Sequence, residues 1–378
     1  MKRLRIGMML PGLGRVERGA EMAFLELARQ WIEADAADVD CFATGPQLPQ
    51  GVHRQPVGCL PREWFERFWP RMPMLRTEFD YEELTYLCHL VATRRYQPQN
   101  YDVIVHCSYP YINWYLQSNR TAGYRPLIAF ITQNGDWPCR RLHREYRYFN
   151  CDALVCINPD YYDRHRQTYA AALIPNGVDP QLFHPGPDPR HPPLPPDRPV
   201  ILMACALVPY KMVLDGILAV AEVPEAFLAI AGDGPLRADV AQLAQERLPG
   251  RHHLFGSLPR EQLASLYRQA DLFLHMSRDE PFGLVYCEAA SSGLPVVAHD
   301  GLVQRWILDD AALYTDTNNL SQTAAVLRQA MRPEIRRPLG ERARERMMAY
   351  FTWPVLAQQY LDFFRERLAQ HPHRREHS

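Results

Sequence analysis

Short apolar runs alternate with amphipathic segments along most of the chain, and the alternation falls into two separate series. A short apolar run bounded by turn residues predicts a buried strand, and an amphipathic segment predicts a helix packed on a sheet. The first series predicts strands near residues 4–10, 39–43, 102–107, 127–132 and 153–157. The second series predicts strands near residues 200–205, 226–231, 254–255, 271–275 and 296–298. The fold class expected from this alternation is α/β, with two parallel sheets covered by helices.

A proline-dense stretch separates the two series. Because proline can neither continue a helix nor lie in a central strand, this stretch is expected to link two lobes. Beyond the second series, apolar residues recur at helical spacing and predict one more helix. The expected organisation is a first lobe over 1–175, a linker over 176–199, a second lobe over 200–349, a C-terminal helix over 350–370 and a tail over 371–378.

The composition agrees with a soluble enzyme. The chain has 378 residues, 47% hydrophobic and 22% charged, enough for two domains of about 170 residues each. A net charge of −1 gives no general electrostatic reason to expect a nucleic-acid partner. Nine cysteines without metal-binding spacing predict reduced thiols in a cytoplasmic protein. No apolar run approaches the about 18 residues of a membrane span, so neither a span nor a secretion signal is expected.

A predicted helix start directly follows the apolar run at 271–275. Residues 276–280 are expected to form the loop that leaves this strand, and Pro281 the first helical residue, where a missing N–H is tolerated. A helix start has free backbone N–H groups and partial positive charge, which suit a diphosphate. The N–H groups expected to bind it are those of Phe282, Gly283 and Leu284.

Two carboxylates, Glu280 and Glu288, flank this helix start. Glu288 lies on the same helical face as Leu284, where its carboxylate can reach the hydroxyls of a ribose beside the phosphates. Glu280 lies before the helix and can point at the sugar. A pair of glutamates at this spacing also arises by chance, and a glutamate at a helix start is favourable to the helix dipole without any ligand.

Lys211 is unusual because it and Lys2 are the only lysines among 42 basic residues. A strand is predicted before it and a helix after it, which places Lys211 at the kind of turn where α/β sheets bind ligands. A compact ammonium suits a phosphate oxygen or a sugar hydroxyl. The alternative is a surface lysine without a function.

The string from Glu280 to Glu288, with Pro-Phe-Gly-Leu between the glutamates and Gly-Leu-Pro-Val-Val after them, resembles the family-four retaining glycosyltransferases. The resemblance implies two Rossmann-like lobes with a cleft between them, the glycosyltransferase B arrangement, and a last helix that returns to the first lobe. It implies that Glu280 and Lys211 are catalytic residues. The implied reaction moves a hexose-type sugar from a nucleotide-diphosphate sugar to an unknown acceptor hydroxyl, with retention of configuration and without another cofactor.

Other donor-binding positions carry over from motifs of the same family. Gly19 matches the glycine of a helix start after the first strand, with Arg18 where another glycine usually lies. Gly232 matches a turn on the nucleotide side, and Leu258 a loop beside the nucleobase. Where many relatives place a histidine near the donor sugar, this chain has two amides that can still bond to sugar hydroxyls, Gln133 and Asn134.

The clearest departure from the family pattern is Ala206, which lies where relatives usually have an arginine. Without that arginine the diphosphate loses a charge-assisted contact, unless Arg18 or Arg278 replaces it. The departure supports a competing hypothesis, a catalytically weak subunit that binds a sugar nucleotide for a partner enzyme. A hydrolase or an epimerase on the same scaffold is a further alternative.

The sequence does not identify the acceptor. Large aromatic side chains in 60–98 can bind sugars or lipid tails, or can form core. They include Trp64, Phe65, Phe68, Trp69, Phe79, Tyr81 and Tyr86. Arg140, Arg144 and Arg147 fit one helix face, directed to water or to an anionic lipid, which leaves peripheral membrane contact open. The resemblance implies that no metal is required. Asp38-Val-Asp40 matches the short Asp-x-Asp pattern of metal-using glycosyltransferases, but it lies in a predicted strand and the pattern is common by chance.

Overall fold

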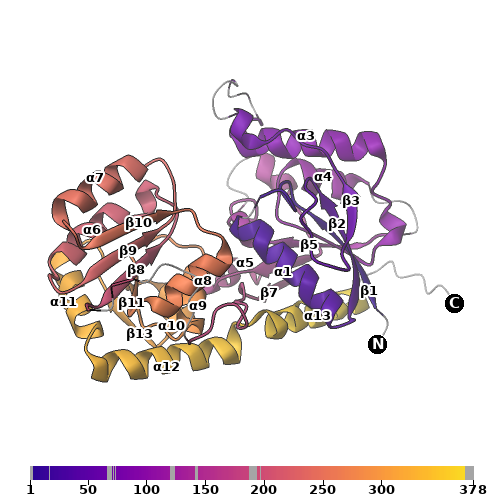
Figure 1. Cartoon of the computed structure of the whole chain (residues 1–378). Coiled ribbons are helices and arrows are strands. Elements are labelled where there is room, and N and C mark those ends of the chain that lie inside the picture. The colour runs from indigo at the N-terminus through magenta and orange to yellow at the C-terminus, as the bar shows by residue number, and fades with distance from the viewer. Residues whose placement is uncertain are drawn as a thin grey trace. The chain divides into compact units, whose positions relative to one another are not determined.

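The computed structural model divides the chain into two compact units (Figure 1). One unit contains the residues up to Pro175 together with those from Trp353 onward, and the other is Asn176–Thr352. The structure describes residues 3–16, 18–65, 70, 72, 74–119, 124–140, 144–186, 194–195 and 197–370, without the side chains of residues 144 and 145. Phe68, Trp69 and the predicted tail 371–378 lie outside these residues.

Within its described residues, the first unit contains a seven-stranded parallel sheet in the order β3-β2-β1-β4-β5-β6-β7. Its strands are β1 (Leu4–Met9), β2 (Ala37–Ala43), β3 (His53–Pro56), β4 (Val103–His106), β5 (Leu127–Ile131), β6 (Ala153–Cys156) and β7 (Ala171–Leu173). Its helices are α1 (Gly19–Glu33), α3 (Glu78–Thr93), α4 (Tyr111–Ser118), α5 (Pro159–His165) and α13 (Trp353–Gln370). Strands β4 and β5 are buried at every residue, which explains why their sequences are continuous apolar runs.

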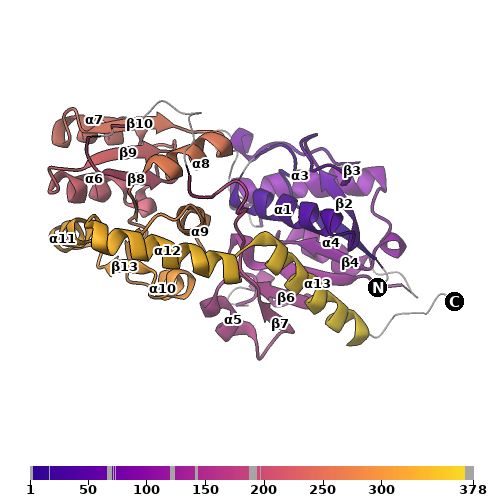
Figure 2. The ribbon, with the colours of Figure 1, turned by 60° about the horizontal axis from the view of Figure 1, so that its bottom comes forward.

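Helix α13 packs against α1 although more than 300 residues separate their contacting side chains (Figure 2). The indole of Trp31 donates a hydrogen bond of 3.0 Å to the carbonyl oxygen of Ala357. The same ring makes edge contacts with Tyr360 and Phe364, at centroid distances of 6.2 and 6.1 Å. These buried aromatic contacts hold the end of the chain on the first unit.

The described residues of the second unit form a six-stranded parallel sheet in the order β10-β9-β8-β11-β12-β13. Its strands are β8 (Val200–Ala204), β9 (Phe227–Ala231), β10 (His252–Gly256), β11 (Leu272–His275), β12 (Val296–His299) and β13 (Ala312–Thr315). Its helices are α6 (Val213–Ala221), α7 (Arg237–Arg247), α8 (Arg260–Gln269), α9 (Leu284–Ser291), α10 (Leu302–Leu308), α11 (Leu320–Ala330) and α12 (Pro333–Tyr350). The two parallel α/β sheets predicted from the two series are therefore confirmed.

Three strands, β3, β7 and β13, were not among the predicted ones. They lie at the edges of the two sheets. An edge strand has neighbours on one side only and need not be a continuous apolar run, as the polar sequence of β3 illustrates.

The first part of the proline-dense stretch packs on the second unit. The N–H of Val178 donates to the carbonyl of Phe351 at 2.8 Å. The side chain of Phe183 is fully buried and contacts Tyr267, while its carbonyl accepts a hydrogen bond of 2.6 Å from Ser291.

The strand orders place one switch point in each unit. In the first unit the order reverses between β1 and β4, and in the second between β8 and β11. In open α/β sheets, ligands bind beyond the carboxyl ends of the strands at such a point. We therefore expect a ligand-binding site at the loops that follow these four strands. None of the helices in the described part of the chain combines the length and the hydrophobicity that spanning a membrane requires.

Candidate active site

The loops after β8 and β11 bring Lys211 and Glu280 together at the switch point of the second unit. Lys211 ends a 3-10 turn, η5 (Pro209–Lys211), that follows β8, and Glu280 lies in the loop between β11 and α9. The Lys211 ammonium forms an ion pair with Glu280 Oε2. Their side chains are only 13% and 10% exposed, so water screens the pair little. The structure thus joins the two residues predicted to be catalytic.

His275, the last residue of β11, holds the same carboxylate from the other side. Its Nε2 lies 3.2 Å from Glu280 Oε2, and the residue is 1% exposed. Burial lowers the pKa of His275 despite the neighbouring carboxylate, so the ring is neutral near pH 7 and donates its Nε2–H. Burial alone would raise the pKa of Glu280, but the His275 hydrogen bond and the Lys211 charge outweigh it and lower the pKa to about 2. Glu280 is therefore ionised throughout the neutral range.

The helix predicted to begin at Pro281 begins three residues later, at Leu284. Gly283 precedes it with a left-handed φ of +80°, which interrupts the helical backbone. A Cβ on Gly283 would lie 2.6 Å from the Tyr286 ring and 2.8 Å from Glu280 Cγ, so glycine is needed for this approach. Of the three N–H groups predicted for a diphosphate, Leu284 lies in the first turn of α9, whereas Phe282 and Gly283 lie in the preceding loop.

Glu288 lies one turn beyond Leu284 on the same face of α9, as its spacing predicts. Its Oε2 accepts a hydrogen bond of 3.2 Å from the hydroxyl of Tyr267. Burial raises the pKa of Glu288, and the nearby Arg260 and this hydrogen bond oppose the rise. Contact with a ribose remains a prediction for this carboxylate.

The structure gives Gly232 a local role. Its φ is +141°, and a Cβ there would lie 1.9 Å from the Cys205 carbonyl oxygen. Its N–H donates to the carbonyl of Gly256 at 2.7 Å. The glycine thus permits close packing of the loops after β8 and β9 against the end of β10. Leu258 is partly buried in the loop after β10, and Ala206 is exposed in the loop after β8.

A cavity of about 590 Å³ lies in the first unit, beside its own switch point. The loops after β1, β4 and β5 and the side of α3 line it. Gly19, Gln133 and Asn134 all contribute to this lining, so three predicted donor-binding residues share one cavity. The Asn134 amide lies 3.6 Å from Cys107 Sγ.

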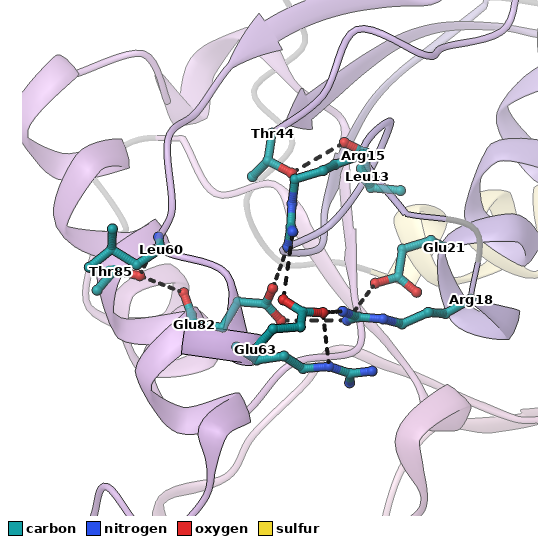
Figure 3. Close-up of polar contacts among 10 residues, drawn as sticks. Leu13, Arg15, Arg18, Glu21, Thr44, Leu60, Glu63, Glu82 and Thr85 are labelled. Carbon is teal, nitrogen blue, oxygen red and sulfur yellow. Dashed lines mark hydrogen bonds and ion pairs between the residues drawn. The ribbon is translucent and has the colours of Figure 1, made fainter. Parts of the chain in front are cut away.

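Arginines and glutamates form a network at this cavity (Figure 3). Arg18 donates to Glu63 at 2.7 Å and lies 3.6 Å from a carboxylate oxygen of both Glu21 and Glu82. Arg15 donates to Glu82 at 2.5 Å. Burial raises the pKa of Glu21, which Arg18 counteracts. Arg18 is therefore held by carboxylates of its own unit.

Glu83, also in the cavity lining, accepts a hydrogen bond of 2.7 Å from the N–H of Ile112 at the start of α4. Burial raises the pKa of Glu83 from 4.5 to about 8, so the folded state keeps it protonated at neutral pH. Because the folded-state pKa is the higher one, the contribution of Glu83 to folding stability is complete below about pH 4.5 and is lost as the pH rises toward 8.

We expect Glu83→Gln to raise the free energy of unfolding at pH 8 by roughly 3–4 kcal/mol relative to its effect at pH 4. The glutamine keeps an acceptor for Ile112 and carries no charge to desolvate. Urea unfolding at the two pH values measures the difference. The exposed Glu33→Gln in α1 serves as the control, and an equal pH dependence in wild type and Glu83→Gln would contradict the prediction.

The remaining candidates divide between core and surface. Tyr86, Phe65 and Tyr81 are buried, whereas Trp64 and Phe79 are 64% and 50% exposed.

The single helix face predicted for three arginines is wrong for the described residues. Arg140 pairs with Asp136 at 2.9 Å, and Arg147 lies in a separate 3-10 helix, η4 (Arg144–Tyr148). In β2, Asp40 accepts from the Tyr101 hydroxyl at 2.7 Å, and Asp38 lies 3.5 Å from Arg3.

Sequence reasoning missed His275 and the glutamates of α3. His275 could have been predicted as a site residue, because it is the last residue of a predicted strand and therefore lies at the carboxyl edge of the sheet, where ligands bind. Glu82 could not, because it pairs with arginines of the β1 loop more than 60 residues away, and Glu83 could not, because its partner is the N–H of Ile112 at the start of another helix.

Comparison with known proteins supplies the class. Residues 187–346 match the family described as glycosyl transferases group 1. The structure is similar to sucrose-phosphate synthase from Thermosynechococcus elongatus, with a TM-score of 0.77 at 21% identity, covering 98% of this chain and 100% of that one. It is also similar to Anabaena HepE in complex with UDP and glucose, with a TM-score of 0.70 at 16% identity, covering 96% and 100%. The chain thus has the glycosyltransferase B fold, with two Rossmann-like domains.

A curated relative is the GDP-mannose-dependent α-(1-6)-phosphatidylinositol monomannoside mannosyltransferase of Mycolicibacterium smegmatis. It is 35% identical over 203 residues, which cover 47% of this chain and 53% of the relative. The chain therefore spans about half the length of this relative. Over residues 187–346 the chain is similar to the group 1 glycosyl transferases. The resemblance read from the sequence is confirmed for residues 187–346 and for the fold, and the motif from Glu280 to Glu288 stays a prediction.

Proposed function

We propose that this chain is a retaining glycosyltransferase that moves a hexose-type sugar from a nucleotide-diphosphate sugar to an acceptor hydroxyl. The observation that carries the proposal is the buried Lys211–Glu280 pair at the carboxyl edge of the second sheet, beside the start of α9. A cation, a helix start and an ionised carboxylate at one switch point suit the two ends of a sugar nucleotide.

The names of similar proteins support the donor class. One relative is GDP-mannose-dependent, and one structural neighbour binds UDP and glucose. Both names refer to a nucleoside diphosphate with a hexose. They differ in the base, so the base and the sugar of the donor stay open.

Charge development in the reaction assigns the roles. When the glycosyl–phosphate bond breaks, negative charge grows on the diphosphate and positive charge on the sugar ring. Lys211 and the N–H groups near Leu284 would stabilise the negative charge on the diphosphate. Glu280 would hold sugar hydroxyls and face the positive charge on the sugar ring. Neutral His275 donates to Glu280 and keeps it oriented. The leaving phosphate would assist deprotonation of the acceptor on the same face, without a metal.

One observation favours a second candidate, a catalytically weak subunit that binds a sugar nucleotide for a partner enzyme. Ala206 supplies no cation at the exposed loop after β8. Of the two arginines considered as replacements, Arg278 donates to Asn318 at 2.9 Å and Arg18 to Glu63. A normal ligand shift without consumption of any donor would favour this candidate. Donor consumption that does not depend on an acceptor would instead indicate a hydrolase or an epimerase.

A thermal-shift panel of UDP, GDP, ADP and their sugars tests the proposed donor site. A ligand at about 100 times its dissociation constant adds roughly 2.7 kcal/mol of stability. We expect one nucleotide series to give such a shift and the others little. The absence of a shift with every nucleotide would contradict the proposed function.

The same proposal includes a cytoplasmic location for the enzyme, with a carbohydrate, lipid-linked sugar or small molecule as acceptor.

A further inference from the structure

The cavity of the first unit is polar in its inner part. Glu21, Glu82 and Glu83 line it and are each 3–4% exposed. Glu21 comes from α1, and the other two from α3, so two elements direct carboxyl groups to one space. Carboxylates that stay hydrogen-bonded in a buried site suit the hydroxyl groups of a ligand.

The rim of the same cavity is exposed to water and combines three apolar side chains with Arg76 and Thr77. Met74, Phe79 and Trp137 line it and are 41%, 50% and 37% exposed. Arg62 lies over the Phe79 ring at 4.5 Å from its centroid. Exposed apolar side chains gathered at the mouth of a cavity are characteristic of a surface that a ligand covers.

The charges of the lining are nearly balanced. Three arginines face four acidic side chains, and these residues are Arg18, Arg62, Arg76, Glu21, Asp80, Glu82 and Glu83. Arg18 is already engaged by carboxylates, and burial raises the pKa of Glu83 to about 8, which leaves it uncharged near pH 7. The lining therefore offers no surplus positive charge for a phosphate or a carboxylate.

From this juxtaposition we infer that the cavity binds the acceptor, and that the acceptor is an amphipathic molecule. An uncharged, hydroxyl-bearing head group lies among the inner carboxyl groups, and an apolar chain covers Met74, Phe79 and Trp137 at the rim. The inference rests on the proposed glycosyltransferase function and names the substrate class of its acceptor.

Binding of short-chain and long-chain pairs tests the inference without a donor. The probes are methyl and octyl glucoside, glycerol and octylglycerol, and octyl phosphate, all below their micelle concentrations and measured by calorimetry. In at least one pair, the octyl compound should bind about tenfold tighter than its short-chain partner, a gain that two buried methylene groups provide. Equal affinities within both pairs would overturn the inference, as would octyl phosphate binding more tightly than both uncharged octyl compounds.

Rim variants separate the cavity from adsorption elsewhere. Met74→Ala and Phe79→Ala should each reduce the octyl-to-short-chain ratio at least threefold. Trp64→Ala, an exposed aromatic residue outside the lining, should leave the ratio unchanged. A ratio that survives both rim variants would overturn the assignment to this cavity.

Vesicles distinguish a membrane-borne acceptor from a dissolved one. Cosedimentation with vesicles of phosphatidylcholine and a diacyl glucoside assigns the acceptor to a membrane, and binding of dissolved octyl compounds alone assigns it to a free amphiphile. Binding to neither overturns the inference. The nucleotide panel is read separately, so a normal nucleotide shift without a chain-length effect removes this inference and leaves the glycosyltransferase proposal intact.

Discussion

Lys211→Met is expected to lower the rate of sugar transfer at least 10²–10³-fold, the effect of removing one donor that stabilises a developing anion. The ammonium is the cation that the second unit holds beside Glu280 and the start of α9. The same change should remove most of the stabilisation that the preferred nucleotide gives in a thermal-shift assay. Initial rates with saturating donor and acceptor measure the first effect, and nucleotide titration measures the second.

Damage to the fold must be separated from loss of chemistry, because Lys211→Met leaves a mostly buried carboxylate without its ion-pair partner. Breaking a buried pair costs about 3–5 kcal/mol, whereas replacing both partners with apolar groups is often neutral. The double variant Lys211→Met/Glu280→Leu should therefore regain much of the lost stability and remain inactive. Transfer by Lys211→Met within tenfold of the wild-type rate would refute the role assigned to the lysine.

The proximity of Lys211 and Glu280 could be predicted from the sequence, because it depends only on where two strands end and on those strands being neighbours in one sheet. The apolar runs before each residue identify parallel strands, and the carboxyl ends of parallel strands lie at one edge of a sheet. Once β8 and β11 are neighbours, the loops that leave them must meet. The side-chain pairing within those loops did not follow, since it depends on the backbone path of a few irregular residues.

The start of α9 shows where local preference fails. Proline is favoured at the first helical position, which made Pro281 the natural choice. Buried contacts of the Phe282 ring with Trp306 and Phe351 instead hold this segment in the loop, and Gly283 adopts a left-handed φ. Tertiary packing of this kind has no signature in the local spacing of residues.

The charge network of the first unit could not be predicted from the sequence either, because it too depends on tertiary packing. Arg18 and Glu82 are far apart in sequence and meet because α3 packs beside the β1 loop. The sequence showed only an unusual arginine at a helix start and a helix with several acids. Their pairing changes the chemistry of both, since Arg18 is no longer a free cation and Glu82 is no longer an unbalanced buried charge.

Glu280→Gln is expected to lower transfer by about 10³-fold while nucleotide binding persists or strengthens. The glutamine keeps an oxygen for His275 but leaves the Lys211 ammonium without an anionic partner. A bound diphosphate supplies that anion, so the nucleotide should stabilise the variant more than it stabilises wild type. Parallel thermal-shift titrations measure this difference. Asp279→Asn, at the exposed neighbouring position, is the control and should match wild type in both assays.

Acid unfolding provides an independent check on the same carboxylate. The pKa of Glu280 is lowered from 4.5 to about 2 on folding, so its contribution is complete above about pH 4.5 and is lost as the pH falls toward 2. The lost stability is on the order of 3 kcal/mol, and Glu280→Gln should lack this part of the acid transition. Transfer by Glu280→Gln at the wild-type rate would exclude the catalytic role of Glu280. Acid unfolding of the variant along the wild-type curve would exclude an ionised Glu280 bound to Lys211.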